Sequence, residues 1–417
     1  MPKLFPKLHY AWVVAATGML VVFGAVGLAR FAFGIILPAM ARDLGLGYAQ
    51  QGTLGTSYFL GYLAILALLS VLPGLVPKYG PRRLCTAGLL LVAVCLAAMS
   101  QNRDYFTLCL LYGLTGIGSG GAFVPAVTMA TEWFTPSHRG RGAGFIISGA
   151  GIGIVVSGFL VPRLQPAFGL ADWQMVWLIF AIVVACLGLL TGLLLRDRPA
   201  DLGLQPLGAA IAVTANEQNG SGAIQGHWPL LAYLGLIYAI YAATCLTYTT
   251  FIVTVMVQDF AITEASAGVL WALVGFLSIF SGALFGFLSD RLGRRQGMII
   301  ALVVQLFAFV LIAFDSGEFG LYLSVLLFGL SAWSLVSIIA AAAGDYFGTN
   351  GAAAGFAILT LMFAVGQSLG PAGAGALSEA TGNFAASFAV ATGLSILTII
   401  LCWFLRPPPA RQPAAAV

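Results

Sequence analysis

Long apolar stretches separated by short polar segments run along the whole chain. A helix that crosses a membrane needs about 20 mostly apolar residues. The first apolar stretch is far longer than the core of a cleavable signal sequence, so we expect it to be retained as a span. Twelve stretches are long enough, and a spanning helix is predicted in each of residues 11–40, 48–72, 83–101, 104–133, 141–165, 173–196, 229–257, 266–288, 297–314, 319–344, 350–377 and 384–405.

One long polar segment divides these spans six and six. It contains several charged residues and a Gly-Ser-Gly run at 220–222, a composition typical of a linker. We therefore predict an N-terminal six-helix bundle over residues 1–196, a cytoplasmic linker over 197–228 and a second six-helix bundle over 229–417. The predicted fold class is an all-α polytopic membrane protein with twelve transmembrane helices.

The composition supports a chain embedded in the lipid bilayer throughout. Of the 417 residues, 60% are hydrophobic and 8% are charged, whereas soluble domains carry about 25% charged residues. The net charge of +4 is not gathered into a basic stripe, so we expect no nucleic-acid partner. The six cysteines stand singly and the three histidines lie in polar connections, so we expect no metal site and no cofactor.

The positions of the basic residues predict the orientation of the chain. Lys and Arg concentrate in cytoplasmic loops. With the N-terminus inside, 14 of the 18 basic residues fall on the inner side, three fall outside, and Arg30 lies within the first span. We therefore expect both termini to be cytoplasmic and the protein to sit in the inner (plasma) membrane. We also expect a monomer.

The two halves of the sequence repeat each other. Residues 132–134 (Glu-Trp-Phe) align with residues 345–347 (Asp-Tyr-Phe), and residues 142–145 align with residues 353–356 at nearly the same offset. Such repeats are typical of secondary transporters, whose substrate site lies between the repeats near the midplane.

The loop before the ninth span carries a further motif. Residues 286–295 read Gly-Phe-Leu-Ser-Asp-Arg-Leu-Gly-Arg-Arg and resemble the signature loop of the major facilitator superfamily. The first-half copy, 77–83, keeps the glycine and the basic residues but has Pro77 where the acid is expected. Its Gly-Pro-Arg-Arg form resembles the oxalate–formate and monocarboxylate branches, and residues 27–33 and 366–371 resemble the YbfB/YjiJ-type branch.

This resemblance implies two bundles that rock about a central cavity lined by the first, fourth, seventh and tenth helices. It also implies that the signature loop closes the cytoplasmic side. We expect the Asp290 carboxylate to meet the positive end of the fifth helix, and the alternative is a solvated loop charge. Because Pro77 lacks a carboxylate, we expect an asymmetric latch: the second-half copy of the loop should contribute more to closing the cytoplasmic side than the first-half copy. The expected gating residues are Asp290, Arg291, Arg294, Arg295, Arg82 and Arg83.

Arg30 is the one charge placed at membrane depth. All 14 acids fall in loops or at the ends of spans, and the repeat places Leu246 at the matching position. A charge inside a span costs about 2.5–3.5 kcal/mol and normally faces a cavity. A guanidinium can bind a carboxylate through two hydrogen bonds. We therefore predict that Arg30 binds a small organic anion, such as a mono- or dicarboxylate. The alternative is that Arg30 extends to the outer head groups.

Polar and aromatic side chains on other helices are further candidates for the binding site. Three of them follow helical spacing on the seventh span, and for each candidate the alternative is core packing. The candidate binding residues besides Arg30 are Tyr112, Tyr241, Thr244, Tyr248, Trp271, Trp333 and Gln367.

The energy source is expected to be a gradient, because the sequence has no P-loop lysine motif. Uniport, anion exchange and proton-linked symport remain open, so protons are a second candidate partner. An efflux pump for neutral hydrophobic compounds is the rival within transport. A non-transporting receptor or scaffold is the rival outside transport. An enzyme is not expected, because no acid or histidine lies in the middle of a span.

Overall fold

The computed structural model describes residues 9–72, 74–164, 171–208 and 227–406. Within these ranges twelve helices are long and apolar enough to cross a membrane, which confirms the number of predicted spans. Several spans end at other residues than predicted. The first runs over Tyr10–Leu44 rather than 11–40, and the eleventh over Ala354–Thr381 rather than 350–377.

The helices up to α8 form the first six spans and the connections between them. Their bounds are α1 (Tyr10–Val22), η1 (Phe23–Phe31), α2 (Ala32–Leu44), α3 (Tyr48–Val71), α4 (Leu75–Tyr79), α5 (Pro81–Ser100), α6 (Tyr105–Trp133), α7 (Pro136–Leu160), η2 (Val161–Arg163) and α8 (Asp172–Leu194). The short helix η3 (Pro199–Leu202) follows the sixth span. Together α1, η1 and α2 form the first span, and η1 is π-helical.

The last six spans contain the helices from α9 onward. Their bounds are α9 (Trp228–Gln258), α10 (Glu264–Leu292), α11 (Arg294–Ala313), α12 (Gly317–Ser331), α13 (Ser334–Thr381) and α14 (Ala385–Phe404). The long α13 contains the end of the tenth span and the whole eleventh span. Its direction changes at Gly348, whose φ of 68° lies in the left-handed region that glycine adopts without strain.

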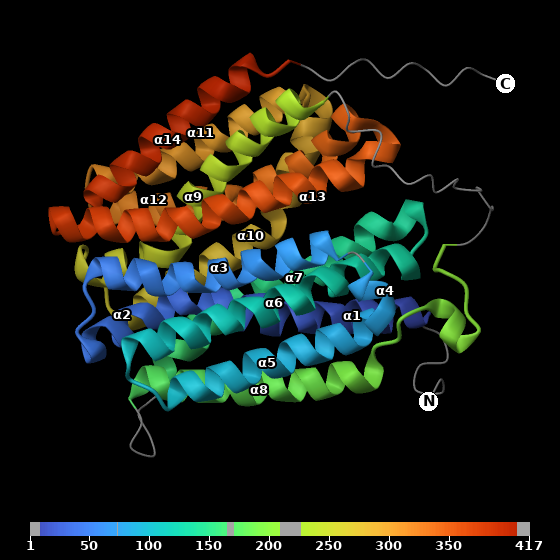
Figure 1. Ribbon diagram of the computed structural model, residues 1–417. Coiled ribbons are helices and arrows are strands. Elements are labelled where there is room, and N and C mark those ends of the chain that lie inside the picture. The colour runs from blue at the N-terminus through green and yellow to red at the C-terminus, as the bar shows by residue number, and fades with distance from the viewer. Residues whose placement is uncertain (1–8, 73, 165–170, 209–226, 407–417) are drawn as a thin grey trace.

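Two bundles make up the molecule, one from α1 to α8 and the other from α9 to α14 (Figure 1). Each bundle has an aromatic core. In the first, the Tyr112 ring lies 5.1 Å from the Tyr58 ring and 6.2 Å from the Trp177 ring, measured between centroids. In the second, the rings of Tyr248 and Phe328 stack at 3.8 Å. Each bundle is thus packed around its own buried rings.

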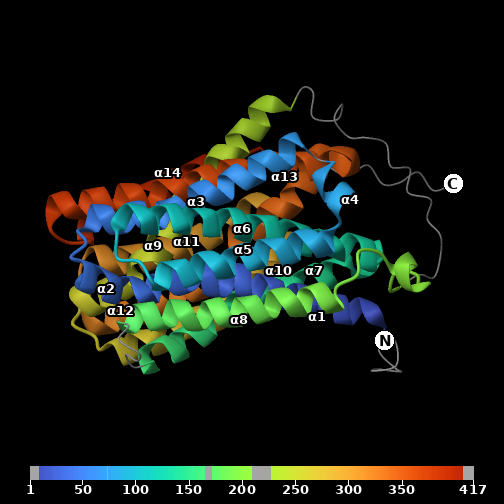
Figure 2. The same ribbon diagram turned by 60° about the horizontal axis from the view of Figure 1, so that its bottom comes forward.

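Three pairs of helices join the bundles: α3 packs along α13, α7 packs along α10, and α2 packs against α9. Figures 1 and 2 both show α3 and α13 side by side. The backbones meet without intervening side chains. A Cβ built on Gly52 would lie 2.4 Å from the carbonyl oxygen of Pro371, and one built on Gly158 would lie 2.5 Å from the carbonyl oxygen of Gly268. Only glycine permits these two contacts.

Both glycine contacts lie toward the same end of the molecule. This end carries the start of α3, the end of α7 and the start of α10, and it is the end that the charge pattern predicts to face outside. We call it the outer end, and the opposite end, which carries α4, the inner end. Figure 1 shows the bundles close together at the outer end and diverging toward the inner end.

The start of the predicted linker folds against the first bundle. Trp133 donates its indole N–H to the carbonyl oxygen of Arg196 at 3.1 Å, and Leu207 exchanges backbone hydrogen bonds with Trp133 and Thr135. Residues 197–208 thus pack on the N-terminal bundle, and the rest of the predicted linker, 209–226, lies outside the described residues.

Candidate functional site

The π-helical segment η1 widens the first span near its middle. Such widened turns occur mostly at functional sites. Hydroxyl groups from two neighbouring helices bond to its backbone. The carbonyl oxygen of Ala25 accepts hydrogen bonds from Tyr58 at 3.3 Å and Ser119 at 2.7 Å, and the carbonyl oxygen of Ala29 accepts one from Tyr112 at 3.2 Å. The predicted binding residue Tyr112 therefore supports the backbone next to Arg30.

A glycine pair lets the widened turn approach α7. A Cβ built on Gly27 would lie 2.7 Å from the Cα of Gly153, and one built on Gly153 would lie 2.3 Å from the Cα of Gly27. Side chains at either position would push η1 away from α7. The position of Arg30, three residues after Gly27, thus depends on this contact.

Arg30 reaches across to the second bundle. Its Nη2 donates a hydrogen bond to Oε1 of Gln367 on α13. The guanidinium carbon lies 4.8 Å from the centroid of the Phe31 ring and 4.9 Å from that of Phe59, within the range of cation–π attraction. The structure therefore brings together two of the predicted binding residues, Arg30 and Gln367, on opposite bundles.

The partners of Arg30 are neutral. Among the described residues, the four ion pairs do not include Arg30. Its Nε is buried and has no hydrogen-bond partner within that part of the chain. A buried donor on a charged group without a partner is costly. The Arg30 guanidinium therefore has a donor and a charge available for a further anionic ligand.

The tenth span is broken opposite η1. Helix α12 ends at Ser331 and α13 begins at Ser334, which leaves Ala332 and Trp333 between them. Tyr241 on α9 donates its hydroxyl hydrogen to the carbonyl oxygen of Ala332. Broken helices near the midplane are typical of transporter binding sites.

The break in the tenth span lies against the first span. The backbone N–H of Trp333 donates to Oγ of Ser281 at 3.1 Å, which fixes the backbone at the break. The Trp333 ring lies 5.2 Å from that of Phe31. Of the predicted binding residues, Trp333 therefore lies at the break and faces the residue next to Arg30, and Tyr241 on α9 bonds to the backbone of the break.

A small cavity lies beside the guanidinium. Its volume is about 10 Å³, room for about one water molecule. Leu246, the residue that matches Arg30 in the repeat, lines the same cavity, so the two equivalent positions lie close together and one of them is charged. The cavity is lined by Arg30, Phe31, Phe33, Gly34, Gly55, Phe59, Tyr112, Leu246, Thr249 and Thr250.

Three other predicted binding residues are not brought to Arg30 by any contact in the described chain. Tyr248 packs in the core of the second bundle, where its hydroxyl lies 3.0 Å from Oγ of Ser324. The Thr244 hydroxyl bonds to the carbonyl oxygen of Tyr241 in its own helix at 3.0 Å. Trp271 is fully buried in α10, and its indole N–H has no partner in the described chain. For Tyr248 this is the core packing expected as the alternative.

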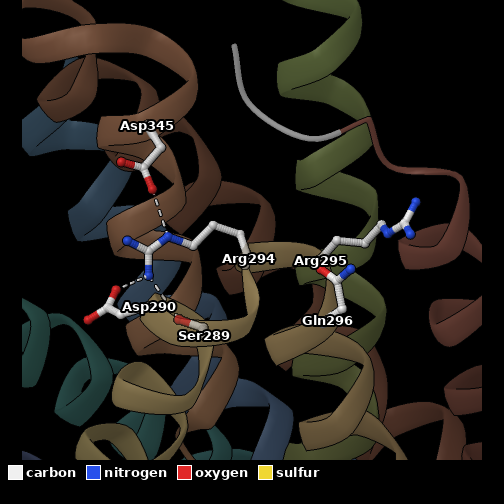
Figure 3. Close-up of a pocket in the computed structure, with 7 residues that line it drawn as sticks. Ser289, Asp290, Arg294, Arg295, Gln296 and Asp345 are labelled. Atoms are coloured by element: carbon white, nitrogen blue, oxygen red, sulfur yellow. Dashed lines mark hydrogen bonds and ion pairs between the residues drawn. The ribbon is translucent and has the colours of Figure 1, made fainter. Parts of the chain in front are cut away.

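The signature loop forms a cluster of charges at the inner end (Figure 3). Arg294 donates from Nε to Asp345 at 2.7 Å and from Nη1 to Asp290 at 2.5 Å and to Ser289 Oγ at 2.8 Å. It thereby links α10 and α13 of the same bundle. A cavity of about 270 Å³ lies here, lined by Ser289, Asp290, Gly293, Arg294, Arg295, Gln296 and Asp345.

Asp290 itself faces solvent, with 63% of its side chain exposed. Among the described residues its hydrogen-bond partner is Arg294 in its own bundle, so the expected contact with the fifth span is not formed in this structure. The neighbouring arginines stack on aromatic rings. The guanidinium of Arg291 lies 4.2 Å from the Phe287 ring centroid, and that of Arg295 lies 5.5 Å from that of Trp403.

The first-half copy of the loop obtains an acid from elsewhere. Asp197, just after the sixth span, accepts the backbone N–H of Arg82 at 2.7 Å. Arg82 also donates from Nε to the carbonyl oxygen of Gly192 at 2.7 Å, while Arg83 is exposed. Sequence reasoning missed Asp197, because nothing in the pattern connects it with a loop 115 residues earlier.

The fold and the sequence together define the class of this protein. Residues 22–403 match the family described as "Uncharacterised MFS-type transporter YbfB". The chain is therefore a membrane transporter of the major facilitator superfamily, and within that superfamily it belongs to the YbfB family. This confirms the resemblance found in the signature loop and in residues 27–33 and 366–371.

Relatives and solved structures agree with this assignment. The hexuronate transporter of Bacillus subtilis (strain 168) is 24% identical over 403 residues, 91% of this chain and 91% of that protein. A quinolone resistance transporter of Acinetobacter baumannii is 24% identical over 447 aligned positions, 100% of this chain and 96% of that protein. The structure of a bacterial homolog of the human lysosomal transporter Spinster has a TM-score of 0.72 at 16% identity, covering 94% of this chain and 95% of that one.

One further relative matches a smaller part of the chain. The 4-hydroxybenzoate transporter PcaK of Acinetobacter baylyi is 29% identical over 174 residues. The match covers 42% of this chain and 36% of that protein. Less than half of each chain therefore enters this comparison.

Proposed function

We propose that this protein is a secondary active transporter that moves a small organic anion by alternating access, and that Arg30 binds the anion. The orientation that goes with this proposal has both termini in the cytoplasm, in the inner (plasma) membrane. Coupling by uniport, anion exchange or proton-linked symport is compatible with it. The working unit is proposed to be a monomer, since each chain carries both bundles.

The guanidinium of Arg30 carries this proposal. It lies between the two bundles, its bonded partner is the neutral amide of Gln367, and its buried Nε has no partner in the described chain. A carboxylate would neutralise the charge and accept from the guanidinium fork. The name of the hexuronate transporter, a relative over 91% of its length, refers to a sugar acid, which agrees with an anionic substrate.

Uptake into proteoliposomes tests the proposal. The panel is glucuronate, tartrate and 4-hydroxybenzoate, each measured under imposed pH and potential gradients. A charged hydrogen bond contributes about 1.5–3 kcal/mol, so Arg30→Gln should lower uptake by about 10- to 100-fold. Arg30→Lys should recover part of it, because lysine keeps the charge but loses the planar fork. Arg163→Gln is the control, since Arg163 is exposed at the outer end and bonds within its own helix turn.

Two results would contradict the proposal. One is that none of the three anions is transported. The other is that Arg30→Gln transports them as fast as the wild type does.

Export of neutral hydrophobic compounds is the second candidate function. It is favoured by the relative named for quinolone resistance, which aligns with 100% of this chain. Export of this kind would not need the cation. Two results together would support this function: the wild type transports no carboxylate, and Arg30→Gln still removes a neutral hydrophobic compound from vesicles.

A further inference from the structure

Gln367 occupies the position at Arg30 where the proposed substrate would bind. Its Oε1 accepts from the terminal nitrogen of the guanidinium, as a carboxylate oxygen would. The amide is 2% exposed, so it does not exchange freely with water. With about 10 Å³ of free volume beside the guanidinium, a carboxylate and Gln367 cannot both occupy this place.

We propose that Gln367 is an internal ligand of Arg30 that the carboxylate of the substrate displaces. This inference rests on the proposed function. In the substrate-free protein the Arg30–Gln367 hydrogen bond ties the first span to the eleventh. When a carboxylate takes its place, the tie between the bundles is replaced by a bond to a mobile molecule. Substrate binding and separation of the bundles are then coupled through one side chain.

The surroundings of Gln367 agree with this role. At the next residue of α13, the carbonyl oxygen of Ser368 accepts from the hydroxyl of Thr56 on α3 at 2.9 Å, a second bond between the bundles. Further along α13, Pro371 meets Gly52 backbone to backbone. Gln367 thus lies close to two contacts that join α13 to α3, so its displacement would act where the two bundles are held together.

A ligand that competes with the substrate weakens the apparent affinity, and removing the competitor strengthens it. We expect Gln367→Leu to bind the transported anion about tenfold more tightly than the wild type, which corresponds to the loss of one charged hydrogen bond. Its maximal rate should fall, because the bundles are no longer tied together for the return step. Gln367→Glu should bind the anion more than tenfold less tightly, because its carboxylate forms an ion pair with Arg30.

The matched control is Gln305→Leu. Gln305 on α11 is also buried, 1% exposed, and its side chain interacts with the thiol of Cys245, which belongs to the same bundle. The same chemical change there removes no bond between the bundles. We expect binding and rate to match the wild type.

The test has two measurements. The first is the half-saturation concentration and maximal rate of uptake for glucuronate, tartrate and 4-hydroxybenzoate. The second needs no substrate: hydrogen–deuterium exchange of residues 48–58 on α3 in reconstituted protein. Gln367→Leu should increase this exchange about tenfold, Gln367→Glu should decrease it, and Gln305→Leu should leave it unchanged.

The outcomes separate this inference from the proposed function. The inference would be overturned if Gln367→Leu binds the anion more weakly than the wild type and shows wild-type hydrogen exchange. If Arg30→Gln is inactive in the same experiment, the proposed function still stands. Wild-type uptake by Arg30→Gln would overturn the proposed function and the displacement step together. A merely structural role of Gln367 would lower the rate without lowering the half-saturation concentration, and this result also overturns the inference.

Discussion

Asp197 accepts the backbone N–H of Arg82 at 2.7 Å, so a residue beyond the sixth span caps the start of the third. The cap satisfies one of the free N–H groups of the first turn of α5 and places a negative charge at the positive end of the helix. Gly80 makes room for it, because a Cβ there would lie 2.6 Å from Oδ2 of Asp197. The first-half copy of the loop, which has Pro77 in place of an acid, therefore obtains a carboxylate from Asp197 after the sixth span.

Replacing this cap should destabilise the first bundle. Asp197→Ala is expected to lower the free energy of unfolding by about 1 kcal/mol, the usual effect of losing a side-chain cap. Thermal unfolding in detergent measures it as a lower Tm. Asp201→Ala is the control, because Asp201 accepts from the backbone N–H of Arg198 at 3.1 Å, at the start of the short helix η3 and away from α5. Equal Tm values for the two variants would contradict the capping role.

The second-half copy of the signature loop should contribute more to the transport rate than the first-half copy. Asp290→Asn keeps the shape of the side chain and removes the charge that pairs with Arg294 at 2.5 Å. We expect it to reduce the initial rate of uptake more than Pro77→Ala does, since Pro77 has no carboxylate to lose. Comparable rates for the two variants would refute the asymmetric latch.

Closure of the outer end should fail when a methyl group enters the backbone contact between α7 and α10. A Cβ on Gly158 would lie 2.5 Å from the carbonyl oxygen of Gly268, and overpacking of this kind costs about 1–3 kcal/mol. Gly158→Ala should therefore raise the population of the outward-open state about tenfold or more. Gly144→Ala on the same helix is the control, because its added Cβ meets nothing within 4 Å.

A reporter cysteine at Gln51 reads this opening. Gln51 is 1% exposed and lines the outer cavity of about 830 Å³. Its labelling by a membrane-impermeant maleimide, in a background without Cys186, should be faster in Gly158→Ala than in Gly144→Ala. Identical labelling rates would show that the glycine contact does not control closure.

The ion pair between Arg42 and Glu264 should contribute less than the glycine contacts. It joins α2 to α10 at 2.6 Å, but 65% and 47% of its two side chains are exposed. Exposed pairs contribute about 0–1 kcal/mol and weaken with salt. Glu264→Gln should raise labelling of the Gln51 reporter by at most about fivefold at low salt and not at all at high salt. The charge-swapped double variant, Arg42→Glu with Glu264→Arg, should restore the wild-type rate.

Acid should loosen the start of the fourth span. The backbone N–H of Thr107 donates to Asp104 at 2.8 Å and, with the Thr107 hydroxyl, lowers the pKa of this carboxyl. A lowered pKa means that the cap stabilises the fold fully above the ordinary Asp range and is lost as the pH falls through the lowered value. The protection factor of the Thr107 amide against hydrogen exchange should fall on acidification in the wild type and lose this dependence in Asp104→Asn.

Hydropathy and charge were sufficient for the outline of the fold, because each span must bury about 20 apolar residues whatever its neighbours are. The π-helical turn before Arg30 could not be read from the sequence. It exists because Tyr58, Ser119 and Tyr112 bond to carbonyl oxygens of that turn, and the sequence does not show which hydroxyls will face which backbone.

The candidate site was predictable in part for a similar reason. Arg30 stood out because a charge in a span is costly, and Gln367 because it is polar in an apolar stretch. Tyr248 satisfied the same helical spacing as Tyr241, yet its ring stacks on Phe328 inside the second bundle. Spacing identifies a helix face, whereas the packing of the other helices decides whether that face meets the partner bundle.

The two glycine contacts have a mechanical consequence. Gly52 touches Pro371 on one flank of the molecule and Gly158 touches Gly268 on the other. A third close contact joins α2 to α9, where a Cβ on Gly34 would lie 2.5 Å from the carbonyl oxygen of Thr249. Backbones this close cannot slide past one another, so while these contacts last the bundles can part only at the inner end.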